Sequence, residues 1–582
     1  MPVNDMNTAY REEACARKKA GLILKNCRLV NVLSGEIEEN IDIAICGKQI
    51  VGVGPGYDAE KTIDVAGRYV YPGFIDAHIH LESTKLTVPE SARMMARCGT
   101  AAVITDPHEI GNVAGLDGLA YQMDSAADNG FIDVFFVLPS CVPTLADAAI
   151  ESAPSTLDAQ KLRMAAQHEA VVGLGELMNV PGILFGDPEV LQKIEDFRTR
   201  GLILDGHAPM LGGPALNACI YMGIQSDHES THLDEAREKL RRGMHIMIRE
   251  GSSEKNLDAL LPLINGKNTS RLMFASDDLD PTDLASRGHI NHLVRRAVAS
   301  GIDPITAIQM ATLSPARYFN LRDLGAIMPG ANASLVIAPD LVNFAPDIVL
   351  HNGEIVYQNG STVAREAHLP HLHPTMNCRL PDLKSLQIRA ASPADIRIIE
   401  LVSGQILTRE AREPAKILDG QAIADPDRDI AKVCVFERHH GSGAFGVAFV
   451  RGFGLKRGAI GSSVGHDSHN LVVVGTSDSD IHACAQQICA MGGGQAAVLG
   501  SDAATLPLPV AGLISDAPAP DVIAAEKRLD DFCAQKLGVT NPRPMAALSF
   551  MSLPVIPELR ITDQGLFHIA PGGYPQKVQV LV

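Results

Sequence analysis

Long apolar segments, paired cysteine motifs and an excess of basic residues are all missing from this sequence. Apolar runs are broken by charge or glycine well before the roughly 18 residues that suggest a membrane span. The eleven cysteines are scattered with no C-x-x-C pair, which is typical of reduced thiols rather than of a disulfide framework. A formal net charge of −18 disfavours binding to a phosphate backbone, which requires a basic surface. We therefore expect no membrane or nucleic-acid partner, and chemistry on a small molecule.

The N-terminal segment also lacks the features of a secretion signal. Residues 1–20 carry charged side chains and contain no apolar h-region. A cytoplasmic location is the resulting expectation.

The chain of 582 residues is too long for one ordinary core, because domains usually run to roughly 100–200 residues and barrels to about 250. Short β-type runs alternate from Leu22 to Val53 and return from Ala333 to Tyr357, where Asn352-Gly353 is a strong two-residue hairpin signal. We predict that residues 1–70 and 322–378 pair into one small β-sandwich domain.

Between these two pieces, residues 71–321 alternate strand-length apolar runs with helix-length segments, which is typical of a parallel sheet. The eight runs begin near Gly73, Ala101, Val134, Val171, Leu202, Gly223, His245 and Leu272. Several end in a residue that can bind metal or move a proton, and the active sites of barrels are assembled from the carboxyl ends of several strands. The predicted fold class is therefore α/β, with a (β/α)₈ TIM-type barrel as the central domain.

A Pro/His-rich connector at 368–374 precedes the rest of the chain, residues 379–582. This part contains strand-like runs at 431–436, 444–450 and 471–474, and helical stretches at 480–491 and 520–537. We predict a third, C-terminal domain of the α+β type.

The predicted barrel strands end in a set of possible metal ligands. His78 and His80 are two residues apart at the end of the first run, so their side chains share one face of an extended chain. Glu176 ends the fourth run, where an unpaired ionised carboxylate would be costly to bury. Further candidates end the fifth, sixth and eighth runs: His207, His228 and Asp277. Four histidines and two carboxylates thus fall in the order expected of a two-metal site.

This set resembles the amidohydrolase superfamily, whose members carry H-x-H on strand one, a bridging acidic ligand on strand four, single histidines on strands five and six, and an aspartate on strand eight. The resemblance covers Leu22 to about Asn359, and the segment PGFIDAHIH at 72–80 is its most specific part. Many members place a carboxylated lysine on strand four. This chain has Glu176 there, which reduces the number of superfamily members that it can resemble closely.

More closely, the chain resembles the bacterial adenine deaminase family over nearly its whole length. The matching segments are TDPHEI at 105–110, GLGELM at 173–178, DGHAP at 205–209, SDHE at 226–229, IREGS at 248–252 and ASDD at 275–278. In the C-terminal part, RHHGSG at 438–443 and GHDSHN at 465–470 resemble that family's additional domain.

The resemblance implies hydrolysis of adenine to hypoxanthine and ammonia by a metal-bridging hydroxide that attacks C6. It implies two divalent ions, manganese or iron, with zinc also compatible with these ligands. His78, His80, Glu176 and Asp277 would hold one ion, and Glu176, His207 and His228 the other. Asp277 would act as general acid/base. His108 and Glu109, after strand two, are candidates for proton donation to a ring nitrogen of the purine.

Several alternatives remain open at this point. A related cyclic amidohydrolase, of the hydantoinase or dihydropyrimidinase type, would use the same metal pair, as would a deaminase of another purine. A barrel without catalysis that serves as a binding protein is an alternative of a different class. Arg249 can form a salt bridge or contact the substrate. Four histidines of the C-terminal part can serve structure, bind another metal or reach over the barrel mouth: His439, His440, His466 and His469. We also expect a homodimer.

Overall fold

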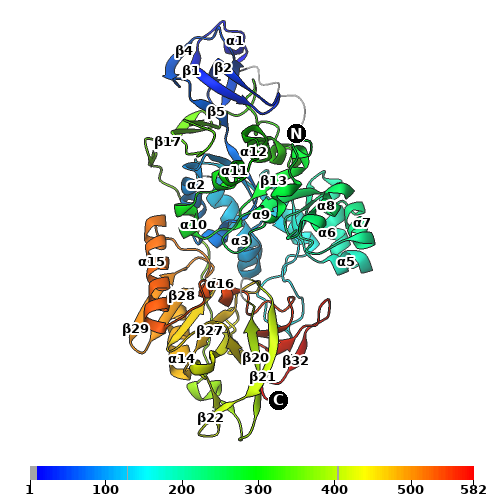
Figure 1. The fold of residues 1–582 in the computed structure, drawn as a ribbon, viewed down its shortest axis with the longest axis vertical. Coiled ribbons are helices and arrows are strands. Elements are labelled where there is room, and N and C mark those ends of the chain that lie inside the picture. The colour runs from blue at the N-terminus through cyan, green and yellow to red at the C-terminus, as the bar shows by residue number, and fades with distance from the viewer. Residues whose placement is uncertain (1–8, 128, 403–404) are drawn as a thin grey trace.

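The computed structural model describes residues 9–127, 129–402 and 405–582, so the first eight residues of the charged N-terminal segment lie outside the described part. Three bodies follow one another along the long axis of the molecule (Figure 1). A β domain formed by both N-terminal and post-barrel strands stands at one end, the barrel is central, and the C-terminal domain closes the other end. Within the described residues, none of the helices combines the length and the apolar character that crossing a membrane requires.

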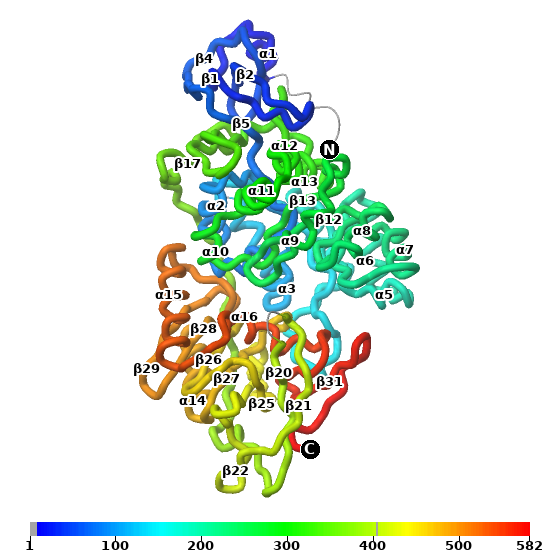
Figure 2. Tube along the Cα trace, viewed as in Figure 1, coloured from blue at the N-terminus to red at the C-terminus, as the bar shows by residue number. Residues whose placement is uncertain are grey.

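The first body is a single nine-stranded sheet to which two distant chain segments contribute. Along the sheet the order is β18-β17-β16-β15-β5-β1-β2-β3, and β4 pairs with β1. Its strands are β1 (Ala20–Asn31), β2 (Glu36–Cys46), β3 (Gln49–Val53), β4 (Ala59–Asp64), β5 (Tyr69–Pro72), β15 (Leu335–Ala338), β16 (Ile348–His351), β17 (Glu354–Gln358) and β18 (Ser361–Thr362). The antiparallel pairing of β5 with β15 joins the two segments, which lie together in the trace (Figure 2).

The predicted hairpin at Asn352-Gly353 is confirmed. Both residues have positive φ angles, 53° and 78°, and they connect β16 to β17 as an antiparallel pair. Asparagine and glycine are the residues that most readily adopt this left-handed conformation, which a two-residue turn of the I′ type requires twice. The turn sequence therefore fixes the register at this edge of the sheet.

The central body is the predicted barrel. Its strands are β6 (Phe74–His80), β7 (Thr100–Thr105), β8 (Asp133–Pro139), β9 (Val171–Leu177), β10 (Ile203–Gly206), β11 (Ser226–Asp227), β12 (His245–Arg249), β13 (Leu272–Ala275) and β14 (Asp277–Asp278). The neighbouring strands pair in parallel in two sheets, β10-β9-β8-β7-β6-β14 and β11-β12-β13. A backbone hydrogen bond of 3.3 Å from Gln225 to Leu204 bridges β10 and β11, and β14 continues from β13 to pair with β6. The sheet thus curls back on itself, and the predicted fold class is confirmed.

Helices cover the outside of the barrel. They are α2 (Val88–Ala96), α3 (His108–Ala127), α4 (Ala159–Ala165), α5 (Val180–Phe185), α6 (Pro188–Thr199), α7 (Gly213–Tyr221), α8 (Leu233–Arg242), α9 (Leu257–Leu260), α10 (Pro281–Ser286), α11 (Ile290–Ala299), α12 (Pro304–Met310) and α13 (Leu313–Tyr318). The start of α6 shows how the sequence sets their ends, because the Asp187 carboxylate accepts hydrogen bonds from the Glu189 and Val190 amides while Pro188 occupies the first turn. Apolar side chains of these helices pack on those of the strands in one large core.

The C-terminal domain is of the predicted α+β type. Its eight-stranded sheet has the order β21-β20-β25-β24-β27-β26-β28-β29. The domain contains β19 (Ile388–Arg389), β20 (Asp395–Leu401), β21 (Thr408–Pro414), β22 (Lys416–Leu418), β23 (Gln421–Ile423), β24 (Ile430–Phe436), β25 (Phe445–Arg451), β26 (Ala459–Ser462), β27 (Leu471–Gly475), α14 (Asp478–Ala490), β28 (Gly494–Leu499), β29 (Asp502–Pro507), α15 (Ala519–Phe532), α16 (Pro544–Ser549), β30 (Leu559–Thr562), β31 (Gly565–His568) and β32 (Gln576–Val578). Outside this domain, at the other end of the molecule, a short helix, α1 (Arg11–Ala14), precedes β1.

This domain packs on the end of the barrel where the strands finish. The Lys85 ammonium group, in the loop after β6, lies 2.6 Å from the Asp280 carboxylate and 2.7 Å from that of Glu526 on α15. On another barrel loop, the Ser152 hydroxyl donates to the Asp563 carboxylate at 2.6 Å. The carboxyl ends of the barrel strands therefore face the C-terminal domain rather than open solvent.

Candidate metal centre

Two predicted ligands stand at the end of β6, a strand whose seven residues are all buried. The Nε2 atoms of His78 and His80 lie 3.2 Å apart. The Nδ1 atom of His80 lies 2.9 Å from the carbonyl oxygen of Asp106. Because a carbonyl oxygen can only accept, Nδ1 carries a proton, and Nε2 is the nitrogen that faces the cluster. The backbone behind His80 thus fixes its ring with Nε2 toward Glu176 and Asp277.

Glu176, at the end of β9, is the centre of the cluster. Its Oε1 atom lies 3.2 Å from His78 Nε2, 3.4 Å from His80 Nε2, 3.6 Å from His207 Nδ1 and 3.1 Å from His228 Nε2. Four imidazoles from three strand ends, those of β6, β10 and β11, therefore surround one carboxylate oxygen. The structure brings together these five of the six predicted ligands.

The sixth predicted ligand, Asp277, lies beside them. Its Oδ1 atom is 3.4 Å from His80 Nε2, and its other oxygen accepts a hydrogen bond from Arg249. Both Asp277 and Glu176 have positive φ angles, 57° and 34°, which are uncommon outside glycine. Such conformations persist where the surroundings impose them, and they are frequent at functional sites.

Several ring nitrogens of the cluster lack a hydrogen-bond partner within the described residues. They include His207 Nδ1 and His228 Nε2, both completely shielded from solvent. A buried polar atom without a partner destabilises the fold, on the order of 1–3 kcal/mol. Divalent ions would satisfy these atoms, because imidazole and carboxylate together suit Mn²⁺, Fe²⁺ or Zn²⁺. Two groups with ligand atoms within 4.8 Å of one another, His78–His80–Asp277 and Glu176–His207–His228, match the two predicted halves of the centre.

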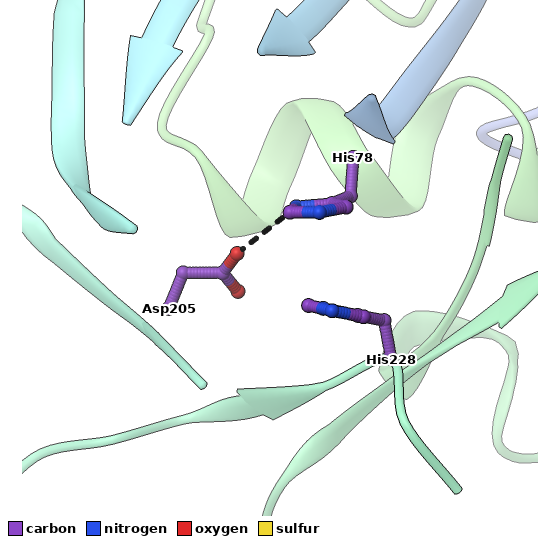
Figure 3. A group of neighbouring side chains, drawn as sticks. All are labelled: His78, Asp205 and His228. Carbon is purple, nitrogen blue, oxygen red and sulfur yellow. Dashed lines mark ion pairs between the residues drawn. The ribbon is translucent and has the colours of Figure 1, made fainter. Parts of the chain in front are cut away.

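Sequence reasoning missed a carboxylate behind His78. Figure 3 shows Asp205, at the end of β10, pointing toward His78, with the His228 ring stacked beneath. Asp205 Oδ2 lies 3.4 Å from His78 Nδ1, and the two rings are 4.1 Å apart at an angle of 18°. A carboxylate on the far nitrogen orients a metal-ligating imidazole. The signal was present, because Asp205 and His207 alternate along the strand as His78 and His80 do.

The sequence allows Arg249 either a salt bridge or a substrate contact, and the structure shows the salt bridge. Its guanidinium binds Glu229, with Nη2 3.0 Å from Oε2, and also reaches Asp277. All three side chains are at least partly buried. Arg249 therefore fixes the orientation of the Asp277 carboxylate.

The other two predicted catalytic residues lie just outside the ligand cluster, at the start of α3. His108 Nδ1 is 3.4 Å from Glu176 Oε2, and His108 Nε2 is 3.1 Å from Glu109 Oε1. Glu109 is also approached from the C-terminal domain, by His466 and His469. Of the alternatives for these two histidines, the structure shows that they reach over the barrel mouth.

Comparisons with known proteins agree with this geometry. Residues 69–356 match the model of the amidohydrolase family, and residues 405–571 match that of the adenine deaminase C-terminal domain. A protein of Desulfatibacillum aliphaticivorans named adenine deaminase is 44% identical over 94% of this chain and 95% of its own length. Proteins with the same name from Dehalococcoides mccartyi, 44% identical over 95% of both chains, and from Oleidesulfovibrio alaskensis, 42% identical over 98% of both, are also similar.

The chain belongs to the adenine deaminase family. Membership accounts for the additional domain, whose family model includes both His466 and His469. It also agrees with Glu176 as the acidic residue on the fourth strand.

Neighbouring imidazoles lower the pKa of two buried carboxylates, Glu176 and Glu109. Burial alone would raise the pKa of Glu176, but the charges of His80 and His108 and the hydrogen bond with His207 outweigh burial and hold the pKa well below its usual range. Burial would likewise raise the pKa of Glu109, but His466, His469 and His108 lower it further. Both carboxylates are therefore ionised at neutral pH.

A cavity of about 220 Å³ lies between the barrel mouth and the C-terminal domain. Its walls include Glu82, Glu109, Asp278, His466 and Phe550. The rings of His466 and Phe550 are stacked, with centroids 4.6 Å apart at an angle of 16°. The cavity thus offers aromatic and polar walls to a small molecule beside the ligand cluster.

Proposed function

We propose that this protein hydrolyses adenine to hypoxanthine and ammonia at a centre of two divalent ions. The observation that carries the proposal is the convergence of four imidazoles on Glu176 at the barrel mouth, with Asp277 beside His80. Relatives with the name adenine deaminase, at 42–44% identity over nearly the whole chain, support adenine as the substrate.

The residues divide into two ligand sets that share Glu176. His78, His80 and Asp277 complete the first set, and His207 and His228 complete the second. Bound divalent ions lower the pKa of water and so supply a nucleophile near neutral pH. Manganese or iron is our proposal for the native metal, since availability in the cell rather than ligand type decides among such ions.

The side chains move the protons of the reaction. Asp277 accepts a proton from the attacking water and passes it to the amine that leaves C6. Arg249 holds this carboxylate in one orientation during both transfers. His108 donates a proton to a ring nitrogen of the purine, which becomes negative when oxygen adds to C6, and Glu109 orients His108 through its Nε2 atom. The second proton of the water leaves the added oxygen when the C6 carbonyl forms and restores the proton that His108 gave. One C–O bond forms and one C–N bond breaks, so water and adenine give hypoxanthine and ammonia.

We further propose a cytoplasmic homodimer. In the described residues all eleven cysteines are free thiols, which agrees with a reducing compartment. Light scattering of the purified protein tests the dimer directly.

The decisive experiment measures ammonia release from a panel of heterocycles. Protein freed of metal is loaded separately with manganese, iron and zinc, and each form is given adenine, other 6-substituted purines, cytosine and a hydantoin. We expect turnover of adenine that depends on the added metal. Turnover of a hydantoin or cytosine without adenine would replace this proposal by that of a cyclic amidohydrolase or a different deaminase, and no turnover with full metal loading would favour a binding protein.

A further inference from the structure

A second buried carboxylate, Glu109, joins the barrel to the C-terminal domain. Glu109 is 3% exposed and belongs to the first turn of α3, the helix that follows β7. Its Oε1 atom lies 2.8 Å from His466 Nδ1, and its Oε2 atom lies in close contact with His469 Nε2. The two imidazoles come from a loop more than 350 residues further along the chain. No other charged side chain of the proposed site takes its partners from outside the barrel in the part of the chain that the structure describes.

The ring of His469 is fixed in one tautomer. The amide N–H of Gly465 donates to His469 Nδ1 at 3.2 Å, so Nδ1 is an acceptor and Nε2 carries the proton. His469 Nε2 lies in close contact with Glu109 Oε2. The loop itself is held by the His469 amide, which donates to the Gly465 carbonyl at 2.7 Å, and the His469 side chain is completely buried. His469 is therefore held rigidly against the Glu109 carboxylate.

His466 is held from two sides. Its ring stacks on Phe550, and its amide donates to the Ser549 carbonyl at 2.7 Å. Both partners belong to the C-terminal domain, at the end of α16. The imidazole thus meets Glu109 as a fixed part of that domain rather than as a mobile surface group.

On its other side, Glu109 contacts the proposed proton donor. The path runs from Glu109 Oε1 to His108 Nε2 at 3.1 Å, and from His108 Nδ1 to Glu176 Oε2 at 3.4 Å. The two imidazoles of the C-terminal domain are therefore connected, through two side chains, to the central carboxylate of the metal centre.

We propose that His466 and His469 are positioning residues, through which the C-terminal domain fixes Glu109 and thereby orients His108 toward the purine. This inference rests on the proposed function. It implies that the barrel alone, despite its complete ligand set, is an incomplete deaminase.

A third metal ion is the main alternative, because His108, Glu109 and His466 lie close enough to bind one. The fixed tautomer of His469 removes this neighbouring residue as a further ligand, since a nitrogen that carries a proton has no lone pair for a metal. The contacts of Glu109 with His466 and His469 are also shorter than those around Glu176, which leaves less room for an ion between the atoms. Metal content distinguishes the two alternatives.

The test uses the full-length, manganese-loaded protein with three substitutions, His469→Ala, His469→Gln and His466→Asn. The exposed His440→Ala, in the same domain, is the matched control. We expect His469→Ala to lower kcat for adenine roughly 10- to 100-fold, the usual loss when a supporting residue is removed, with KM changed by less than about threefold. His469→Gln, whose side-chain amide can still donate to Glu109, should recover much of this loss. His466→Asn should lower kcat less than His469→Ala does, and metal content should stay at the wild-type value throughout. The thermal midpoint of His469→Ala should fall, because the buried Gly465 amide loses its acceptor, so kcat is compared at a temperature at which every variant is fully folded.

A double-mutant cycle separates positioning from folding effects. If His469 acts through Glu109, then His469→Ala in a Glu109→Gln background should cost less than about twofold, whereas independent effects would multiply. Activity of His469→Ala within twofold of wild type, a glutamine variant no better than alanine, or loss of one metal equivalent would each overturn the inference. Lack of adenine turnover by the wild-type protein would instead refute the proposed function, before any variant is compared.

Discussion

Two buried carboxylates, Glu176 and Glu109, are each surrounded by imidazoles, but they differ in where those imidazoles come from. The four around Glu176 stand at strand ends of one barrel, at 3.1–3.6 Å. Two of the three around Glu109 belong to another domain and approach to 2.8 Å or less. The difference in distance agrees with our proposals that the first carboxylate shares its neighbours with metal ions and that the second is held directly by its neighbours.

Replacement of Glu176 is expected to lower activity more than any other substitution considered below. Glu176→Gln should lower kcat/KM for adenine by at least about 10³-fold, because both ligand sets lose their shared oxygen. Metal analysis of the purified variant should show fewer than two ions per chain. Glu195→Gln, an exposed residue on α6, is the control and should match wild type. A Glu176→Gln variant with full metal content and activity would remove the distinction between the two carboxylates.

Metal removal tests the same distinction through stability. A chelator should abolish activity and lower the thermal midpoint, because ions that bind only the folded state stabilise it. Added Mn²⁺ should restore both in wild type and in Glu109→Gln, although the latter stays less active. Restoration of the midpoint in Glu176→Gln, to the same extent as in wild type, would contradict the ligand assignment.

Of the described residues in the cluster around Glu176, Arg249 contacts only Asp277. Its substitution is therefore expected to lower activity less than substitution of Glu176 does. Arg249→Lys keeps the charge but loses the planar fork that contacts Glu229 and Asp277 together. We expect kcat to fall roughly 10- to 100-fold with metal content unchanged. The exposed Arg11→Lys serves as control, and a variant that changes KM alone would indicate a substrate contact instead.

Glu151 provides the smallest and most specific test. It is buried like the other two carboxylates, but the groups that act on its pKa within the described residues are Ser468, Asp467 and Asp563 rather than imidazoles. Burial raises its pKa from 4.5 to about 8. The folded protein therefore keeps a proton that the unfolded chain releases, and stability should fall as pH rises from about 4.5 to about 8. In Glu151→Gln this fall in the thermal midpoint should be smaller. Exposed Glu60→Gln should retain the wild-type profile, and an identical slope in Glu151→Gln would disprove the assigned pKa.

Much of the fold and of the first cluster followed from local patterns. The eight strand-length runs coincide with β6 to β13, and alternation along β6 placed His78 and His80 on one face. Asp205 and His207 alternate in the same way, but the sequence did not predict that Asp205 orients His78, because that depends on where the His78 ring lies. The pairing of Arg249 with Glu229 and Asp277 was not predictable, because the three residues come from different strand ends whose spacing only the closed barrel sets.

The sequence by itself determined the elements, the parallel barrel and the residues that end its strands, since side-chain periodicity and turn chemistry act over a few residues. The sequence also predicted that the two flanking β segments join in one domain, but only the tertiary structure gave the strand order of the nine-stranded sheet and decided that His466 and His469 meet Glu109. The physical reason is the distance along the chain over which each effect acts. Contacts between residues hundreds of positions apart depend on how whole domains pack, and no local pattern in the chain records that packing.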